Sequence, residues 1–297
     1  MTGPPPGGLL VVDKPAGCTS HDVVARVRRL AGTRRVGHAG TLDPMATGVL
    51  LVGVDRATRL LGHLALTEKR YTGTAVLGAT TSTDDAEGEL VAEVDATSVT
   101  DEAVRAVAAT LVGELDQVPP AVSAIKVDGV RSYTRARAGQ AVALAARRIT
   151  VHSLDVLAVR RLGARIEVDL DVTCTSGTYI RALARDLGAA LGVGGHLSAL
   201  RRTQVGAWDL ASAVTLDELA VDGALAAALI PLARVAALSF PRRDVDDADA
   251  ARVAHGVRLP AVGQVAGPIA VFGASGDFLA LVEERDDVAV PLAVFVG

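Results

Sequence analysis

The chain has 297 residues, which is enough for one large domain or two, and half of its residues are hydrophobic, so a sizeable core can form. A net charge of −4 excludes a uniformly basic nucleic-acid-binding protein. The sequence has no apolar run of about 18 residues, which excludes a membrane-spanning helix.

Neither the N-terminal residues nor the cysteines indicate export. The start, Met1–Pro6, lacks a charged stretch followed by a hydrophobic segment, so we expect no signal peptide. Cys18 and Cys174 lie far apart and form no C-x-x-C motif, which disfavours a zinc site. These features together predict a protein of the reducing cytoplasm that has no contact with a membrane.

The charges are unevenly distributed along the chain. Residues 1–70 carry ten Lys/Arg against five Asp/Glu, and residues 124–148 carry six against one. Residues 236–297 are acidic, with five Lys/Arg against nine Asp/Glu. A polyanion would therefore meet two basic surfaces on an acidic protein, although ordinary solvated charge explains the pattern as well.

The first predicted elements are a strand and a helix. After a flexible leader over residues 4–8, Leu9–Val12 has the composition of a buried strand. Thr19 or Ser20 can cap a helix that runs to about Leu30, with Gly32 as its stop signal. Its predicted apolar stripe consists of Val23, Val24, Val27 and Leu30.

A glycine-rich loop, Gly37–Gly48, follows this basic helix and precedes an apolar run, Val49–Val54. Asp43 is the only acid in the loop, and Pro44 holds it in an extended or turn conformation. Five arginines come just before the loop, at positions 26, 28, 29, 34 and 35, where they suit a phosphate backbone that approaches the acid. The plainer alternatives are an Asp-Pro turn and a solvated helix face.

The rest of the chain alternates between helical and strand patterns. The predicted elements are a helix at 55–66, a strand at 72–77, a solvated polar turn at 80–88 rather than a metal site, a helix at 99–114 capped by Thr100, a basic helical insertion at 131–148, an alternating strand at 165–173, a helix with Leu183 and Leu187 inward, and a helix that starts at the Thr215–Glu218 capping box and ends near Pro231. Short strands with Gly and Asp turns fill residues 240–297.

The loop Gly37–Gly48 with Leu50 resembles the catalytic motif of the TruB family of pseudouridine synthases, Gly-His-x-Gly-x-Leu-Asp-Pro-x-Ala-x-Gly-x-Leu, at every fixed position. Further stretches match along the chain. They are Asp13–Gly17, the Lys-x-Tyr element at Lys69 and Tyr71, a Thr-x-Thr-x-Asp-x-x-Gly pattern from Thr81 to Gly88, Gln117–Gly129, Ser176–Arg181 and Gly194–Arg202.

The resemblance implies a role for each matched residue. Asp43 would be the catalytic aspartate, Tyr71 would pack against the target base with a part in proton transfer, and Arg181 would form an ion pair with Asp43. A bidentate arginine keeps such a carboxylate ionised. The implied substrate-binding residues are Lys14, His38, Lys69, Lys126, Tyr179, Leu200, Arg201 and Arg202. Among them, Lys14 would support the loop, Leu200 would close the base pocket, and Arg201 and Arg202 would either reach phosphate or be structural. From the residues alone, simpler interpretations remain open. Lys14 could be an exposed turn lysine, Tyr71 a tyrosine at a strand start, and Arg181 a solvated helix arginine.

The implied fold is mixed α/β (α+β), with a large, mostly antiparallel sheet, flanking helices and a small C-terminal PUA-like β domain. We expect a catalytic domain over 1–236, which contains a basic RNA-clamping insertion at about 124–148, and the PUA-like domain over 237–297. The segment 255–259 has the Gly-x-x-Leu look of PUA barrels, but the acidity of this region departs from a module that grips RNA.

The implied function is isomerisation of uridine 55 in the T loop of tRNA to pseudouridine, by an aspartate nucleophile acting on a flipped-out base. The resemblance implies no cofactor and no metal, and we expect a monomer whose partner is the T-arm stem-loop of tRNA. Two alternatives stay open: a non-catalytic protein that folds tRNA, and a pseudouridylase that depends on a guide RNA.

Overall fold

The computed structural model describes residues 7–296 except 123–125, 128–129, 132–143 and 264–265, and it describes no side chains between 123 and 143. The chain divides into two compact units. The first unit comprises residues 1–43, 49–66 and 206–297, and the second comprises residues 44–48 and 67–205. Most of the predicted leader and most of the basic insertion therefore lie outside the described residues.

Four strands form the main sheet of the first unit: β1 (Gly8–Lys14), β2 (Val36–Ala39), β3 (Thr47–Val54) and β14 (Val214–Thr215). β1 lies between β14 and β3, and it runs parallel to β14 with Val12 opposite Val214. β2 pairs antiparallel with β3. The predicted strand at Leu9–Val12 is confirmed.

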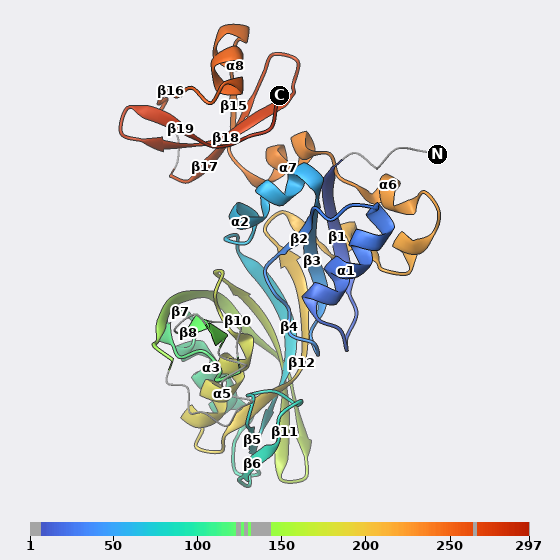
Figure 1. Cartoon of the computed structure of the whole chain (residues 1–297). Coiled ribbons are helices and arrows are strands. Elements are labelled where there is room, and N and C mark those ends of the chain that lie inside the picture. The colour runs from blue at the N-terminus through green and yellow to red at the C-terminus, as the bar shows by residue number, and fades with distance from the viewer. Residues whose placement is uncertain (1–6, 123–125, 128–129, 132–143, 264–265, 297) are drawn as a thin grey trace. The chain divides into compact units, whose positions relative to one another are not determined.

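Helix α1 (Ser20–Ala31) packs on this sheet, and Figure 1 draws the helix and β1, β2 and β3 in blue. The helix has the predicted ends. The hydroxyl of Thr19 accepts a hydrogen bond from the backbone N–H of Asp22, and the Asp22 carboxylate accepts one from the N–H of Thr19. The helix stops at Gly32, which adopts a left-handed conformation with φ of 62°. The predicted cap and stop signal are thus confirmed.

The apolar stripe of α1 was predicted correctly except at its end. Val23, Val24 and Val27 are buried, whereas Leu30 is 36% exposed. Ala31 is buried instead, because it lies four residues after Val27 and seven after Val24, which is the helical repeat of one face. The core cluster of the first unit consists of Leu10, Val12, Val23, Val24, Val27, Ala31, Val36, Leu50, Val52, Val54, Leu216, Leu219 and Leu225.

The remaining helical segments of the first unit are short: η1 (Asp55–Arg59), α2 (Leu61–Leu64), η2 (Leu210–Ser212), η3 (Glu218–Ala220), α6 (Ala224–Ala228) and α7 (Leu232–Ser239), with a short strand β13 (Trp208–Asp209). The Thr215 N–H donates to Glu218 Oε2 over 2.7 Å, and the Glu218 N–H donates to the Thr215 hydroxyl over 3.2 Å. The capping box is therefore present, but a continuous helix up to Pro231 was wrong, because Gly223 interrupts it with φ of 79°.

The C-terminal residues form a separate five-stranded sheet with the order β15-β17-β18-β19-β16, as the strand pattern predicted. Its elements are β15 (Arg242–Asp244), α8 (Asp247–Ala254), β16 (Leu259–Pro260), β17 (Pro268–Phe272), β18 (Phe278–Arg285) and β19 (Val288–Val294). Two arginines of η1 bind the end of β19 and the residue that follows it: Arg59 Nη1 donates to Val294 O over 2.7 Å, and Arg56 Nη1 donates to Phe295 O over 2.9 Å.

The second unit contains five antiparallel sheet strands in the order β12-β4-β11-β10-β7, with the start of β3 parallel to β12. Its strands are β4 (Lys69–Leu77), β5 (Ala79–Thr81), β6 (Leu90–Glu93), β7 (Gly113–Gln117), β8 (Lys126–Val127), β9 (Val130–Arg131), β10 (Arg147–Leu162), β11 (Arg165–Cys174) and β12 (Gly195–Val205). Alternate residues of β11 are buried from Ile166 to Cys174, which confirms the predicted strand.

Two helices pack against the sheet of the second unit: α3 (Asp101–Thr110), which contacts β10, and α5 (Ile180–Ala190), which contacts β12. Thr100 caps α3 as predicted. The helix ends before the predicted Glu114, because Gly113 has φ of 109° and opens β7. Arg147 and Arg148, predicted to lie in a helical insertion, belong to β10.

The mixed α/β class is confirmed, with a mostly antiparallel sheet in the second unit and a β-rich C-terminal part. Among the helices of the described ranges, none has the length and apolar character needed to cross a membrane.

Candidate active site

Leu42, the residue that precedes Asp43, is hydrogen-bonded to the first residue of α1. The Ser20 hydroxyl accepts a hydrogen bond from the Leu42 N–H over 2.9 Å and donates to Leu42 O over 3.2 Å. Both residues are buried, Ser20 completely. The backbone that leads into Asp43 is therefore held at both the N–H and the C=O of Leu42.

His38 lies on β2, five residues before Asp43, and is half-buried. Its ring meets the ring of His21, on α1, edge to face, with 5.3 Å between the centroids and 81° between the planes. Helix α1 thus supports the motif at two points, one at Leu42 and one at His38.

Lys14 is fully buried at the end of β1, and its Nζ donates to Pro15 O over 2.9 Å. A solvent-exposed turn lysine is therefore excluded. The burial favours a supporting role in the Asp13–Gly17 turn over a direct contact with phosphate.

The five arginines ahead of the motif differ in what they bind. Arg26 pairs with Asp217 at 2.7 Å, Arg28 donates to Val36 O over 2.8 Å, and Arg35 lies 3.5 Å from Asp55. Arg29 and Arg34 are exposed. Three of the five arginines thus bind groups of the protein itself, while the side chains of Arg29 and Arg34 lie at the surface.

The second half of the motif, Pro44–Gly48, belongs to the second unit, where β3 begins beside β12. Gly48 has φ of 100°, and a Cβ built on it would lie 2.1 Å from Arg202 O. No side chain fits in that space, so this motif glycine is required by the close approach of two backbones.

Strand register assigns the candidate residues of β4 and β12 to two faces. Tyr71 pairs with Arg202 and Leu200 pairs with Gly73, so Tyr71, Leu200 and Arg202 share one face of the sheet. Arg201 is one residue out of step and lies on the opposite face. There its Nη1 donates to Thr47 Oγ1 over 3.3 Å.

A pocket of about 460 Å³ in the second unit is lined in part by Arg201, Leu200 and Met45, together with hydroxyls of β4 and Asp169. Asp169 is held there by Thr74 Oγ1 over 2.8 Å. Leu200, predicted to close the base pocket, therefore lines the same pocket as Arg201, whereas Tyr71 is not among its lining residues.

Two further cationic residues of the second unit are buried rather than presented to solvent. Arg202 is 1% exposed, which favours the structural alternative for it. Lys69 is 6% exposed and its Nζ donates to Thr67 O over 2.7 Å. Burial, together with the positive charge of Arg202, lowers the pKa of Lys69 to about 8. Burial also raises the pKa of its strand neighbour Cys174 to about 11.

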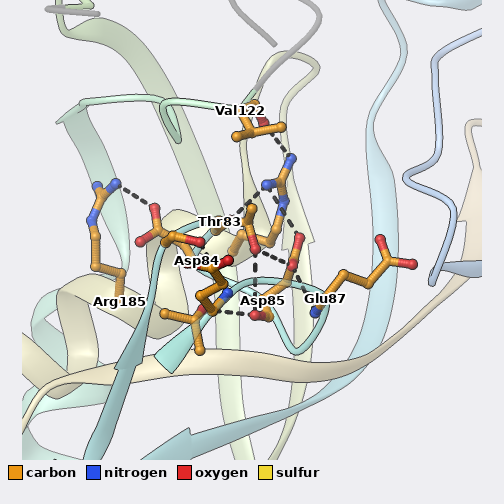
Figure 2. Close-up of polar contacts among 10 residues, drawn as sticks. Thr83, Asp84, Asp85, Glu87, Val122 and Arg185 are labelled. Atoms are coloured by element: carbon orange, nitrogen blue, oxygen red, sulfur yellow. Dashed lines mark hydrogen bonds and ion pairs between the residues drawn. The ribbon is translucent and has the colours of Figure 1, made fainter. Parts of the chain in front are cut away.

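Arg181 is buried at the first turn of α5 and binds three groups of the second unit (Figure 2). Its Nη1 donates to Thr83 O over 2.7 Å and lies 3.3 Å from Asp85 Oδ2, and its Nη2 donates to Val122 O over 3.0 Å. A solvated helix arginine is therefore excluded. Its pairing with Asp43 stays a prediction.

Asp85 was missed as a site residue, because the segment around it was predicted to be a solvated turn. It is 4% exposed, and besides Arg181 it accepts hydrogen bonds from the Thr83 hydroxyl and from the Glu87 N–H, as Figure 2 shows. The turn is also pinned to β12, because the Ala86 N–H donates to Leu197 O over 3.0 Å. The match to the family pattern was the signal that could have identified it.

Asp84 precedes this carboxylate and takes up an unusual left-handed conformation, with φ of 59°. It lies 3.0 Å from Arg185 Nη1, and burial raises its pKa although Arg185 opposes that effect. Neighbouring acids thus bind neighbouring arginines of α5: Asp84 with Arg185, and Asp85 with Arg181.

Tyr179 is half-buried and stands directly before α5, with its backbone bound by the side chain of Gln117. Lys126 lies on β8, but its side chain is outside the described residues. The second unit therefore contains Tyr71, Tyr179, Arg181 and Leu200, whereas Lys14, His38 and Asp43 belong to the first unit.

Three family models match the chain in succession. Residues 28–180 match the N-terminal domain of TruB family pseudouridylate synthases, and residues 181–236 match the tRNA pseudouridylate synthase B C-terminal domain. Residues 240–296 match a model described as tRNA pseudouridine synthase II, C-terminal.

Similar curated proteins carry the name tRNA pseudouridine synthase B. The chain is 57% identical to the protein from Thermobifida fusca, over 98% of this chain and 99% of that protein. It is 55% identical to the protein from Streptomyces griseus, over 98% of this chain and 97% of that protein.

Solved structures with a similar fold include an H/ACA RNP bound to a substrate RNA that contains 2′-deoxyuridine. The similarity has a TM-score of 0.72 at 25% identity and covers 98% of this chain and 85% of that one. A Cbf5-Nop10-Gar1 complex has the same TM-score of 0.72 at 26% identity, with 98% and 84% covered.

Proposed function

Because the chain belongs to the TruB family of pseudouridylate synthases, we propose that it converts uridine 55 in the T loop of tRNA to pseudouridine. The observation that carries the proposal is the unbroken motif from Gly37 to Leu50, in which Asp43 is the only acid. The name shared by the curated relatives, tRNA pseudouridine synthase B, supports tRNA as the substrate.

The reaction is an isomerisation within one nucleotide. The bond between N1 of the base and C1′ of the sugar breaks, the base turns, and a bond forms between C5 and C1′. N1 gains a proton and C5 loses one, so no atoms are added or removed overall. A reaction balanced in this way requires no cofactor.

Asp43 would act on a base that has left the helical stack. Extruding a base costs a few kcal/mol, which stacking and hydrogen bonds in the pocket recover. Three routes fit one carboxylate: attack on C1′, attack on C6, or assistance to formation of a glycal. Each requires an ionised Asp43, which Arg181 would provide by pairing with it.

Tyr71 would stack on the extruded base and take part in proton transfer, while Leu200 would close the pocket. Their common face on neighbouring strands supports this arrangement. Asp85 would act indirectly, because it binds Arg181 at 3.3 Å within the protein.

The RNA contacts would concentrate on the T-arm stem-loop. The exposed Arg29 and Arg34 close to the motif support this, as does the acidity of the C-terminal segment. We assign catalysis to residues 1–236 and propose that 237–297 form an auxiliary module. The family models that end at residue 236 and begin at 240 support this boundary. The enzyme would act as a monomer in the cytoplasm, where its tRNA substrate is found.

A guide-RNA-dependent enzyme is the weaker alternative. The similarity to the H/ACA RNP structure is 25%, against 57% to a protein named tRNA pseudouridine synthase B. A non-catalytic tRNA-folding protein remains the competing outcome of the experiment.

The test is to incubate purified protein with a tRNA transcript and to map pseudouridine by carbodiimide modification. Wild type should modify position 55 without any added RNA, and Asp43→Asn should bind tRNA but leave it unmodified, because the amide has the shape of the carboxylate without its charge. Substantial turnover by Asp43→Asn contradicts the mechanism. Faster tRNA folding without pseudouridine would identify the chain as a non-catalytic tRNA-folding protein. A requirement for an added guide RNA would identify it as a guide-RNA-dependent enzyme.

A further inference from the structure

We propose that Gln117 is a positioning residue of this enzyme, which sets the place of the Tyr179 ring by gripping the Tyr179 backbone. The inference rests on the proposed function and on the predicted role of Tyr179 as a substrate-binding residue. No role had been predicted for Gln117 beyond its place in the segment Gln117–Gly129.

Two hydrogen bonds join the Gln117 side chain to the Tyr179 backbone. Gln117 Nε2 donates to Tyr179 O over 3.1 Å, and the Tyr179 N–H donates to Gln117 Oε1 over 2.8 Å. The carboxamide therefore pairs with Tyr179 as a neighbouring β-strand would, which fixes both the position and the rotation of its backbone. Gln117 is 4% exposed, so water does not compete freely for these bonds.

Tyr179 also takes part in the first turn of α5, because the Leu183 N–H donates to Tyr179 O over 3.2 Å. It stands at the N-cap of α5 in an extended conformation, with φ of −101° and ψ of 110°, and its side chain makes no capping hydrogen bond. Gly177, two residues earlier, has φ of 88°. Gln117, a side chain from outside the helix, thus adds hydrogen bonds to both the N–H and the C=O of Tyr179.

Gln117 can impose this restraint because its own backbone is rigid. It is the last residue of β7 and pairs with Arg147 of β10. The next residue is anchored as well, since Arg185 Nη2 donates to Val118 O over 2.8 Å. The position of the sheet is therefore transmitted to Tyr179 by a single side chain.

The decisive variant is Gln117→Leu, which keeps most of the volume but removes both hydrogen bonds. Displacing a group that contacts substrate should lower the single-turnover rate about tenfold to a hundredfold, with tRNA affinity changed less than about twofold. Thr175→Val is the matched control. The Thr175 hydroxyl accepts from the Thr150 N–H over 2.9 Å and donates to Thr150 O over 3.3 Å, a similar two-point grip elsewhere in the same unit. Its rate should equal that of wild type.

A double-mutant cycle separates action through Tyr179 from general packing. In a Tyr179→Leu background, Gln117→Leu should lower the rate no further. Full additivity of the two losses would overturn the proposal, as would an unchanged rate for Gln117→Leu alone or an equal loss for Thr175→Val.

A spectroscopic measurement tests the grip even if the protein proves to make no pseudouridine. The chain has three tyrosines, so 3-fluorotyrosine labelling gives three ¹⁹F resonances, and the one from Tyr179 is identified with Tyr179→Phe. Gln117→Leu should shift or broaden the Tyr179 resonance and leave that of Tyr71 in place. An unmoved Tyr179 resonance, or equal changes at Tyr71, refutes the grip independently of the enzymatic activity.

Discussion

At the scale of single residues, Asp85 and Arg181 form a buried ion pair whose partners lie far apart in sequence. Removing one member of such a pair leaves the other charge without compensation, which is more costly than never having had the pair. The Thr83 hydroxyl and the Glu87 N–H hold Asp85 in place, so the carboxylate positions the arginine rather than following it.

Asp85→Asn should therefore destabilise the protein by about 3–5 kcal/mol and slow isomerisation more than it weakens tRNA binding. The free energy of unfolding comes from denaturant titration, and rate and affinity come from single-turnover and binding assays. Asp84→Asn is the control, because its pair with Arg185 is more open to solvent. Equal losses from the two substitutions would show that Asp85 has no special role toward Arg181.

The lowered pKa of Lys69 predicts how the stability of the protein depends on pH. Its pKa in the folded protein is about 8, against 10.5 for an ordinary lysine, so between these values the unfolded chain binds more protons and stability rises with pH. Below pH 8 Lys69 is charged in the folded and the unfolded protein, and the cost of burying its charge lowers the free energy of unfolding by the full amount. Lys69→Met should thus stabilise the protein at pH 7, by up to about 3 kcal/mol, and less at pH 9.5. Unfolding titrations at the two pH values measure this, and a gain independent of pH would contradict it.

The sequence could predict some of these residues and not others. Asp43 stands out because a long motif surrounds it, and Arg181 matches a shorter one. Asp85 was misread because Thr, Asp and Gly also make solvated turns. The burial of Lys14, Lys69 and Arg202 was not foreseen, since charged residues are seldom buried and their partners come from distant parts of the chain.

At the scale of elements, local chemistry decided what was predictable. Helix α1 has a capping box and a terminal glycine, and both of its ends were correct. In β11 apolar and polar residues alternate, and its strand was correct. The prediction of one continuous helix after Thr215 was wrong, because a capping box starts a turn but cannot prolong it past Gly223. Helix length depends on tertiary packing, which local signals do not contain.

Helix α5 approaches the turn before β12 so closely that Gly188 leaves no room for a side chain. A Cβ there would lie 2.2 Å from the carbonyl carbon of Gly194. Helix propensity alone favours alanine over glycine by about 1 kcal/mol, but overpacking against backbone should reverse the sign. Gly188→Ala is expected to destabilise the protein by about 1–3 kcal/mol, measured by chemical unfolding.

Gly62, in α2, is the matched control because nothing lies within 4 Å of a Cβ placed on it. Gly62→Ala should be neutral or slightly stabilising. If Gly188→Ala also raised stability, the close packing of α5 on the turn would be refuted.

At the scale of the whole molecule, charge distribution predicts which RNA suffices as substrate. Residues 1–70 and 124–148 are basic and residues 236–297 are acidic, so contacts should concentrate on the T arm. A T-arm hairpin should therefore react with a kcat/KM within about a thousandfold of full tRNA, or 4 kcal/mol, and its binding should weaken steeply with salt. The comparison is made at one salt concentration. A larger loss would place essential contacts elsewhere on the tRNA and assign a binding role to the C-terminal segment.

The division into units was beyond local sequence signals, because it depends on pairings across the whole chain. The predicted boundary after residue 236 followed a change of composition, whereas the compact unit that contains the C-terminal residues also includes residues 1–43, 49–66 and 206–236. Compositional patterns show where chain character changes but do not show which distant segments pack together.

The parallel pairing of β1 with β14 has a consequence for biosynthesis. Val12 is opposite Val214, and Leu9 bridges to Ile230, so β1 leaves the ribosome about two hundred residues before its partners. At roughly 5–20 residues per second, that interval lasts about 10–40 s. The nascent protein therefore carries an apolar, unpaired strand edge at its N-terminal end, and that edge is open to pairing with other chains until β14 and Ile230 have been translated.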